Sequence, residues 1–206
     1  MAVTTANRLL TVSILFNAFI VGGVLMGFEM LGSRYLFPYF GGGIGTWASL
    51  ISTVLSALAI GYFAGGAVVG RYPSPRIIAG AILLAAIYLA LVPATADRVM
   101  SQILNSMGDG PSAILLAAAA LLLVPLSLLG TFSPVAVRLL THSAEASGGV
   151  AGLVYGISTI GNVAGTLITT FALIPTIGSR SITYLYAAAL AVCAGILFLP
   201  IGKKPS

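Results

Sequence analysis

Residues 9–31 read LLTVSILFNAFIVGGVLMGFEML, an apolar stretch in which Glu29 is the single charged side chain. A helix that crosses the hydrocarbon core of a bilayer needs about 20 mostly apolar residues, because lipid offers its backbone no hydrogen-bond partners. This stretch is long enough to cross once, and it lacks the small-residue cleavage site that ends a signal peptide. We therefore expect it to be a membrane-spanning helix.

The composition of the whole chain supports the same reading. Of its 206 residues, 59% are hydrophobic and only 6% are charged, whereas ordinary soluble domains have about 25% charged residues. A soluble domain of this length could not bury so much apolar surface. The net charge of +5 is not accompanied by a basic cluster with interleaved aromatic residues, so nucleic acid is not an expected partner.

About six segments are long and apolar enough to span a bilayer. We predict an all-α polytopic membrane bundle that forms a single integral membrane domain over residues 1–206. The predicted helices are roughly 9–31, 45–70, 76–95, 112–139, 149–176 and 181–201. Pro125 lies inside the fourth and is expected to kink it, and Cys193, the single cysteine, is expected to pack in the sixth.

The basic residues predict how the chain is oriented, because Lys and Arg are enriched in cytoplasmic connections. The two termini and the second and fourth connections contain Arg8, Arg71, Arg76, Arg138, Lys203 and Lys204. The other three connections contain Arg34, Arg98 and Arg180. We therefore predict a multi-pass protein with both termini in the cytoplasm.

Two of the predicted helices carry glycines at spacings that place them on one helix face. They are Gly61, Gly65, Gly66 and Gly70 in the second helix, and Gly152, Gly156, Gly161 and Gly165 in the fifth. Small residues let helix backbones approach closely within a membrane. Packing within the chain, a subunit interface and a face that slides during transport all fit this pattern.

Carboxylates are scarce, and their positions differ. Asp97 and Asp109 fall in the predicted third connection and Glu145 in the fourth, where solvated loop charges are expected. Glu29 lies within a predicted span, where a carboxylate is costly unless it is paired, neutralised, or facing water or a substrate. It is therefore the candidate binding residue, as a substrate site, as a proton site or as one half of a structural ion pair.

Arg34 follows Glu29 five residues later in the sequence. On an ideal helix this offset is about 140° around the axis, so the two side chains would not face each other. Either the helix ends between them, for example at Gly32, or each charge has a partner elsewhere. A misplaced helix boundary is the remaining reading.

Aromatic side chains surround this pair and extend into the next predicted helix. They are Tyr35, Phe37, Tyr39, Phe40 and Trp47. Such residues form belts at the membrane–water interface, and they can also line a vestibule that attracts an organic cation through cation–π contacts. Tyr155 and Asn162 offer hydrogen bonds near the glycine face of the fifth helix.

The sequence lacks the motifs of known catalytic sites: metal-binding His–Glu or Cys pairs, a phosphate-binding loop and a dinucleotide fingerprint. We therefore expect no enzymatic activity, no cofactor and no metal site in this chain.

The stretch EMLGSRYLFPYFGGGIGTWASLISTVLSALAIGYFAGG, residues 29–66, resembles the membrane half of bacterial spermidine synthase-like membrane proteins. These are also described as fused major-facilitator/spermidine-synthase proteins. The similarity continues through residues 130–180, including Tyr155 and Asn162. The resemblance implies half of a major facilitator fold in a bacterial inner membrane, and a half-sized chain would complete that fold as a parallel homodimer.

The segment GGAVVGRYPSPR, residues 65–76, also resembles the cytoplasmic loop between the second and third helices of major facilitator transporters. This likeness implies a gating role for Gly70, Arg71 and Arg76, although the usual loop aspartate is missing. The soluble synthase domain of the fused proteins has no counterpart in these residues, so polyamine synthesis is not expected.

Two functions follow from these observations. The first is transport of a small solute, for which the resemblance suggests an organic cation such as a polyamine. Glu29 would bind the cation or a proton, Arg34 would balance its charge, and Tyr35, Tyr39, Trp47, Tyr155 and Asn162 would shape the path. The alternative is a non-transporting membrane module that anchors or regulates a separate, cytoplasmic synthase-like partner.

Overall fold

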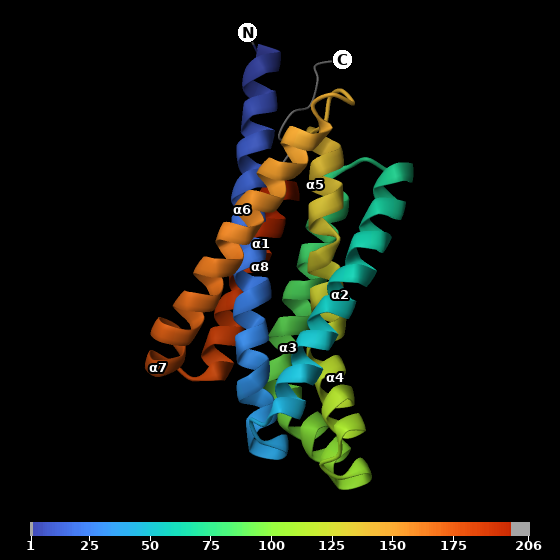
Figure 1. Ribbon diagram of the computed structural model, residues 1–206. Helices are drawn as coiled ribbons and strands as arrows, with labels where there is room; N and C mark the ends of the chain where they lie inside the picture. Colours follow the sequence, from blue (N-terminus) through green and yellow to red (C-terminus); the bar gives the residue numbers. More distant parts are fainter. Residues whose placement is uncertain (1, 199–206) are drawn as a thin grey trace.

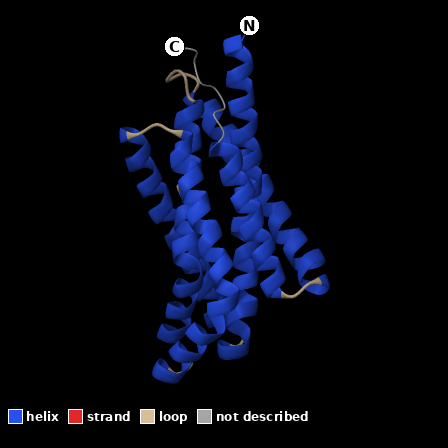
Figure 2. Ribbon diagram, turned by 180° about the vertical axis from the view of Figure 1, so that it is seen from behind, coloured by secondary structure: helices blue, strands red, loops and turns tan. Residues whose placement is uncertain are grey.

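The computed structural model describes residues 2–198, and within this range the chain is helical with no strand. Three long helices come first: α1 (Ala2–Phe40), α2 (Ile44–Arg71) and α3 (Pro75–Met107). The second half contains α4 (Pro111–Gly130), α5 (Phe132–Leu140), α6 (Ser147–Ile168), the π-helical turn η1 (Thr169–Leu173), α7 (Ile174–Thr176) and α8 (Ser179–Phe198). Short connections join them at the two ends of one elongated bundle (Figures 1 and 2).

These elements form six apolar spans, each long enough to cross a membrane, in the described part of the chain. The fourth span consists of α4 and α5, and the fifth consists of α6, η1 and α7. The predicted all-α polytopic bundle is therefore confirmed. Figure 1 shows the start of α1 at the same end as the α2–α3 and α5–α6 connections, and we call this the N-terminal end of the bundle.

Three predicted helix boundaries are wrong, beginning with the start of the first helix, which lies at Ala2 and not at residue 9. The first helix does not end at residue 31 but continues through Gly32 and Arg34 to Phe40. The third does not end at residue 95, because Ala96, Met100 and Ile103 recur at helical spacing and are buried in the core. Asp97 and Arg98 therefore belong to a helix and not to a loop. A helix can continue beyond the hydrocarbon layer, where hydropathy alone no longer marks it.

The fourth span is interrupted at Thr131, and the kink expected at Pro125 stays a prediction. α4 runs through Pro125, and the helix breaks only at Thr131, whose N–H bonds to the carbonyl of Leu128. Pro134 follows three residues later and has no N–H to donate to Gly130, so the two short helices cannot form one regular ladder. The helix predicted at 181–201 is α8, which begins at Ser179 in the structure. Its predicted final residues, 199–201, lie outside the described residues.

The glycine-rich segment after α1 forms the tight bend that its composition predicts. Gly41 has a φ of +69°, a left-handed conformation that other residues rarely adopt. The side chain of Thr46 donates a hydrogen bond of 3.0 Å to the Gly41 carbonyl, which ties the bend to the first turn of α2.

The helix contacts reveal an internal symmetry. The most extensive pairings are α1 with α6, α2 with α4, and α3 with α8. Suppose that each of the first three spans changes places with its counterpart in the last three: α1 with α4, α2 with α6, and α3 with α8. The α1–α6 pairing then becomes the α2–α4 pairing, and the α3–α8 pairing stays the same. Since the exchanged spans cross the membrane in opposite directions, this is the pattern of an inverted repeat.

Glycines mediate both of the equivalent pairings. A methyl group at Gly161 would overlap the carbonyl of Phe19 on α1, and one at Gly61 would overlap the carbonyl of Ser127 on α4. Gly165 and Gly65 make similar close approaches one turn later. Packing within the chain therefore explains these four glycines. The others of the predicted faces, Gly66, Gly70, Gly152 and Gly156, have open space above them.

Candidate functional site

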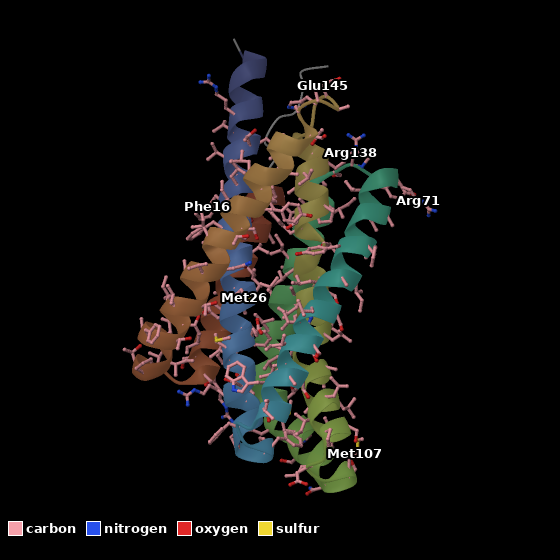
Figure 3. The ribbon with its side chains drawn as sticks, in the orientation of Figure 1. Phe16, Met26, Arg71, Met107, Arg138 and Glu145 are labelled. Carbon is pink, nitrogen blue, oxygen red and sulfur yellow. The ribbon has the colours of Figure 1, made fainter. Side chains whose placement is uncertain are left out.

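Glu29 lies on the face of α1 that points into the bundle, and its side chain is only 7% exposed. It lines a cavity of about 280 Å³, together with residues of α2, α4, α5 and α6. We call this space the Glu29 cavity. Met26, one turn before Glu29, also lines it and lies about midway along the bundle (Figure 3).

The Glu29 cavity contains other polar groups besides the carboxylate. Ser158 and Asn162 lie one turn apart on α6, Ser133 comes from α5, and Tyr62 comes from α2. The side-chain oxygen of Asn162 is buried and has no hydrogen-bond partner. The remaining wall is apolar, so the polar groups stand out as potential ligands for something that enters the cavity.

Glu29 has no protein partner in the described part of the chain. No hydrogen bond joins it to another residue, and the one ion pair there connects Arg180 of α8 with Asp97 of α3. Glu29 is thus a buried carboxylate that faces a cavity without a balancing cation. Such a group is costly in a membrane interior unless a proton, a cation or water compensates it.

Arg34 does not supply the missing charge. Its side chain is exposed and lines a separate hollow of about 370 Å³, which we call the Arg34 hollow. The structural ion pair between the two residues is therefore excluded, and so is a helix end at Gly32. Glu29 and Arg34 do not meet because residues five apart on a continuous helix point in clearly different directions.

The predicted aromatic residues separate into different environments. Tyr35 is buried against α8, where its hydroxyl lies 2.9 Å from the hydroxyl of Thr183. Tyr39 is partly buried and contacts the ring of Phe40 at a centroid distance of 6.5 Å. Trp47 lines the Arg34 hollow. None of these three lines the Glu29 cavity, so their part in the path of a solute stays a prediction.

Tyr155 is close to the Glu29 cavity without lining it. Its ring meets that of Tyr62 edge to face, with centroids 6.4 Å apart and planes at 88°. Because Tyr62 lines the cavity, the pair connects α2 and α6 beside it. Of the predicted site residues, the structure therefore brings together Glu29 and Asn162, with Tyr155 behind Tyr62.

Sequence reasoning did not place Tyr62, Ser133 or Ser158 in the site. One of them carried a usable signal, because Ser158 lies four residues before Asn162 and so shares its helix face. Tyr62 and Ser133 approach Glu29 only through the packing of α2 and α5, which no local pattern reports.

The predicted gating residues lie at the N-terminal end of the bundle. Gly70 and Arg71 are in the last turn of α2, Arg76 is in the first turn of α3, and all three are exposed. Figure 3 shows Arg71 at this end, together with Arg138 and Glu145. The pKa of Glu145 is lowered by hydrogen bonds from its own backbone and from the Ser143 side chain. These residues stand apart from the Glu29 cavity.

The residues from 2 to 198 contain no cluster of three or more His, Cys, Asp or Glu side chains that could hold an ion. Cys193, which was expected to pack, is buried in α8.

Comparisons with protein-family models, with curated proteins and with solved structures find no match to this chain. The resemblance to the spermidine synthase-like membrane proteins therefore stays a prediction.

Proposed function

We propose that this protein transports a small cation through the Glu29 cavity. The observation that carries the proposal is the unpaired, buried carboxylate of Glu29 facing a cavity. A carboxylate retained at membrane depth without a protein cation needs a mobile one, either a proton or a charged solute.

The other polar groups suit an ammonium-type solute. An ammonium group donates three hydrogen bonds, and the Glu29 carboxylate and the unpartnered Asn162 oxygen are acceptors on facing helices. The Tyr62 ring adds a surface that attracts cations. A volume of about 280 Å³ accommodates a short organic amine and excludes bulky solutes.

The arrangement of the helices fits a transporter. The inverted pairing of α1–α6 with α2–α4 surrounds the cavity with two symmetry-equivalent interfaces, and transporters built from such repeats place their substrates at the repeat interface. The cavity lies between α1, α2, α5 and α6, where the two repeats meet.

A parallel homodimer is part of this proposal. Ile51 and Leu55 of α2 line the cavity and are nevertheless 48% and 62% exposed, so the cavity is open along this edge. Gly66, Gly70, Gly152 and Gly156 present backbone with open space above it on the two flanking helices. A second copy packed there would close the cavity.

Uptake into proteoliposomes tests the proposal. Purified protein would be reconstituted, and the entry of radiolabelled methylammonium, putrescine and spermidine would be measured with and without a pH gradient. Glu29→Gln keeps the side-chain shape and removes the charge, so we expect uptake to fall at least tenfold. Asp109→Asn is the matched control, because Asp109 is an exposed carboxylate outside the cavity.

Equal uptake by the Glu29→Gln variant and the parent would overturn the role of Glu29. A protein that moves none of these cations, and no protons, would instead favour the alternative function of a membrane module that docks a cytoplasmic partner. The exposed Arg71, Arg76, Arg138 and His142 at the N-terminal end would then be the surface to probe.

A further inference from the structure

The Arg34 hollow is distinct from the Glu29 cavity and lies at the opposite end of the bundle from the N-terminus. Its wall combines Arg34 and Ser33 of α1, Thr46 and Trp47 from the first turn of α2, and Thr170 of η1. With about 370 Å³ it is larger than the Glu29 cavity.

Arg34 has no acidic partner among the residues that the structure describes. The chain contains four Asp and Glu residues, all within the described range. Asp97 pairs with Arg180, Glu29 lines the other cavity, and neither Asp109 nor Glu145 contributes to the hollow. The guanidinium therefore presents its five N–H donors to a hollow that contains no carboxylate.

Two further features of the hollow favour an anion. The hydroxyl oxygen of Thr170 is buried and has no hydrogen-bond partner, so its O–H is available to donate. α2 begins at Ile44, and its first turn, which contains Thr46 and Trp47, lies with its N-terminus beside the hollow. The positive end of the helix dipole adds to the charge of Arg34.

The depth of the hollow indicates where the anion comes from. The apolar run of α1 ends near Leu31, and Arg34 follows about 5 Å further along the axis at 1.5 Å per residue. This is the level of lipid headgroups, as the exposed aromatic rings of Phe37 and Trp47 also indicate. Planar guanidinium groups bind phosphate oxygens in a bidentate manner.

We propose that the Arg34 hollow binds the phosphate of an anionic phospholipid headgroup. Arg34 would contribute the paired N–H donors, Thr170 a hydroxyl donor, and Trp47 an aromatic wall. This site is independent of cation transport, because it shares no lining residue with the Glu29 cavity.

Native mass spectrometry of delipidated protein in detergent tests the proposal, with phosphatidylglycerol or phosphatidylcholine added in known amounts. We expect retention of phosphatidylglycerol to fall at least tenfold in Arg34→Gln. Arg98→Gln is the matched control, because Arg98 is an exposed arginine near the same end of the bundle and does not line the hollow. It should retain the lipid within twofold of the parent.

Three further variants keep the test decisive. Arg34→Lys retains the charge without the bidentate geometry and should bind several-fold more weakly than the parent, even if Arg34→Gln fails to fold. Thr170→Val should also weaken retention, whereas Glu29→Gln should not. Equal losses of lipid retention in Arg34→Gln and Arg98→Gln would overturn the site. If Arg34→Gln does not fold, equal losses in Arg34→Lys and Arg98→Gln would overturn it in the same way.

The source of the phosphate is tested separately by adding inorganic phosphate at millimolar concentration. A bound lipid that remains assigns the site to the headgroup. The opposite result has two parts: phosphate displaces the lipid from the parent, and the Arg34→Gln variant binds no phosphate. Together they would overturn the lipid assignment and indicate a soluble phosphate as the ligand.

Discussion

Glu29 and Arg34 lie five residues apart on α1, yet they belong to two different regions of the molecule. The Glu29 cavity contains an acid without a base, and the Arg34 hollow contains a base without an acid. In a chain with so few charges, pairing the two would have been simple, since a spacing of four would have placed them on one face. The offset of five keeps both charges available for something outside the chain.

The ion pair between Asp97 and Arg180 makes the contrast clearer. Here two charges from α3 and α8 do meet, and both side chains are more than half exposed to the surroundings. The chain thus pairs charges where water would already solvate them and leaves its buried carboxylate unpaired. This is the opposite of what stability alone would favour, and it is typical of a functional site.

The largest effect is expected from Gly22, which lies where α1 packs against α6 beside the Glu29 cavity. At Gly22 any side chain would overlap the backbone carbonyl of Ser158 and crowd Asn162, so Gly22→Thr should lower the free energy of unfolding by about 3 kcal/mol. Gly43, beside the Arg34 hollow, has open space and a φ of −69°. Gly43→Thr should change stability by less than about 0.5 kcal/mol, because Thr and Gly cap helices similarly.

Thermal unfolding in detergent would compare these two variants. Comparable losses of stability would show that the α1–α6 contact is no tighter than the bend after α1.

The next effect has the opposite sign. Glu29→Leu removes an unpartnered polar group from the bundle interior and should raise the free energy of unfolding by about 1–2 kcal/mol while abolishing uptake. Arg34→Leu should change stability by less than about 0.5 kcal/mol, because that side chain is exposed.

Denaturant titration together with the uptake assay would measure both quantities. A loss of stability in Glu29→Leu would contradict the view that this carboxylate is kept for function, and it would favour a structural role.

The smallest effect should come from the paired charges. Asp97→Asn breaks the ion pair with Arg180, but exposed pairs contribute only about 0–1 kcal/mol. The change should shrink further as salt is added, because screening weakens exposed pairs most. Unfolding measured at low and high salt checks this, and a larger, salt-independent loss would mean that the pair is more important to the α3–α8 contact than its exposure suggests.

The sequence predicted the coarse architecture correctly and the limits of the helices less well. Hydropathy identifies residues that suit hydrocarbon, so it located all six spans and missed the parts of α1 and α3 that extend beyond it. The helical spacing of the apolar residues Ala96, Met100 and Ile103 was the sequence signal that α3 continues, and the structure buries all three.

For the candidate site, the sequence picked out Glu29 because no other carboxylate lies within an apolar run. It also showed that Arg34 could not face Glu29 on a continuous helix. It could not tell that Tyr35 packs against Thr183, or that Trp47 belongs with Arg34 and not with Glu29.

The division between the two kinds of information has a physical reason. Composition and spacing along one helix are local, and they determined that this is a membrane bundle with one acid inside a span, which Arg34 could not face if the helix continued between them. What surrounds Glu29 depends on how α2, α5 and α6 pack against α1, and that packing is set by close glycine contacts between residues far apart in the chain. Only the tertiary structure decided that Ser133, Ser158, Asn162 and Tyr62 meet Glu29, because no single segment contains them all.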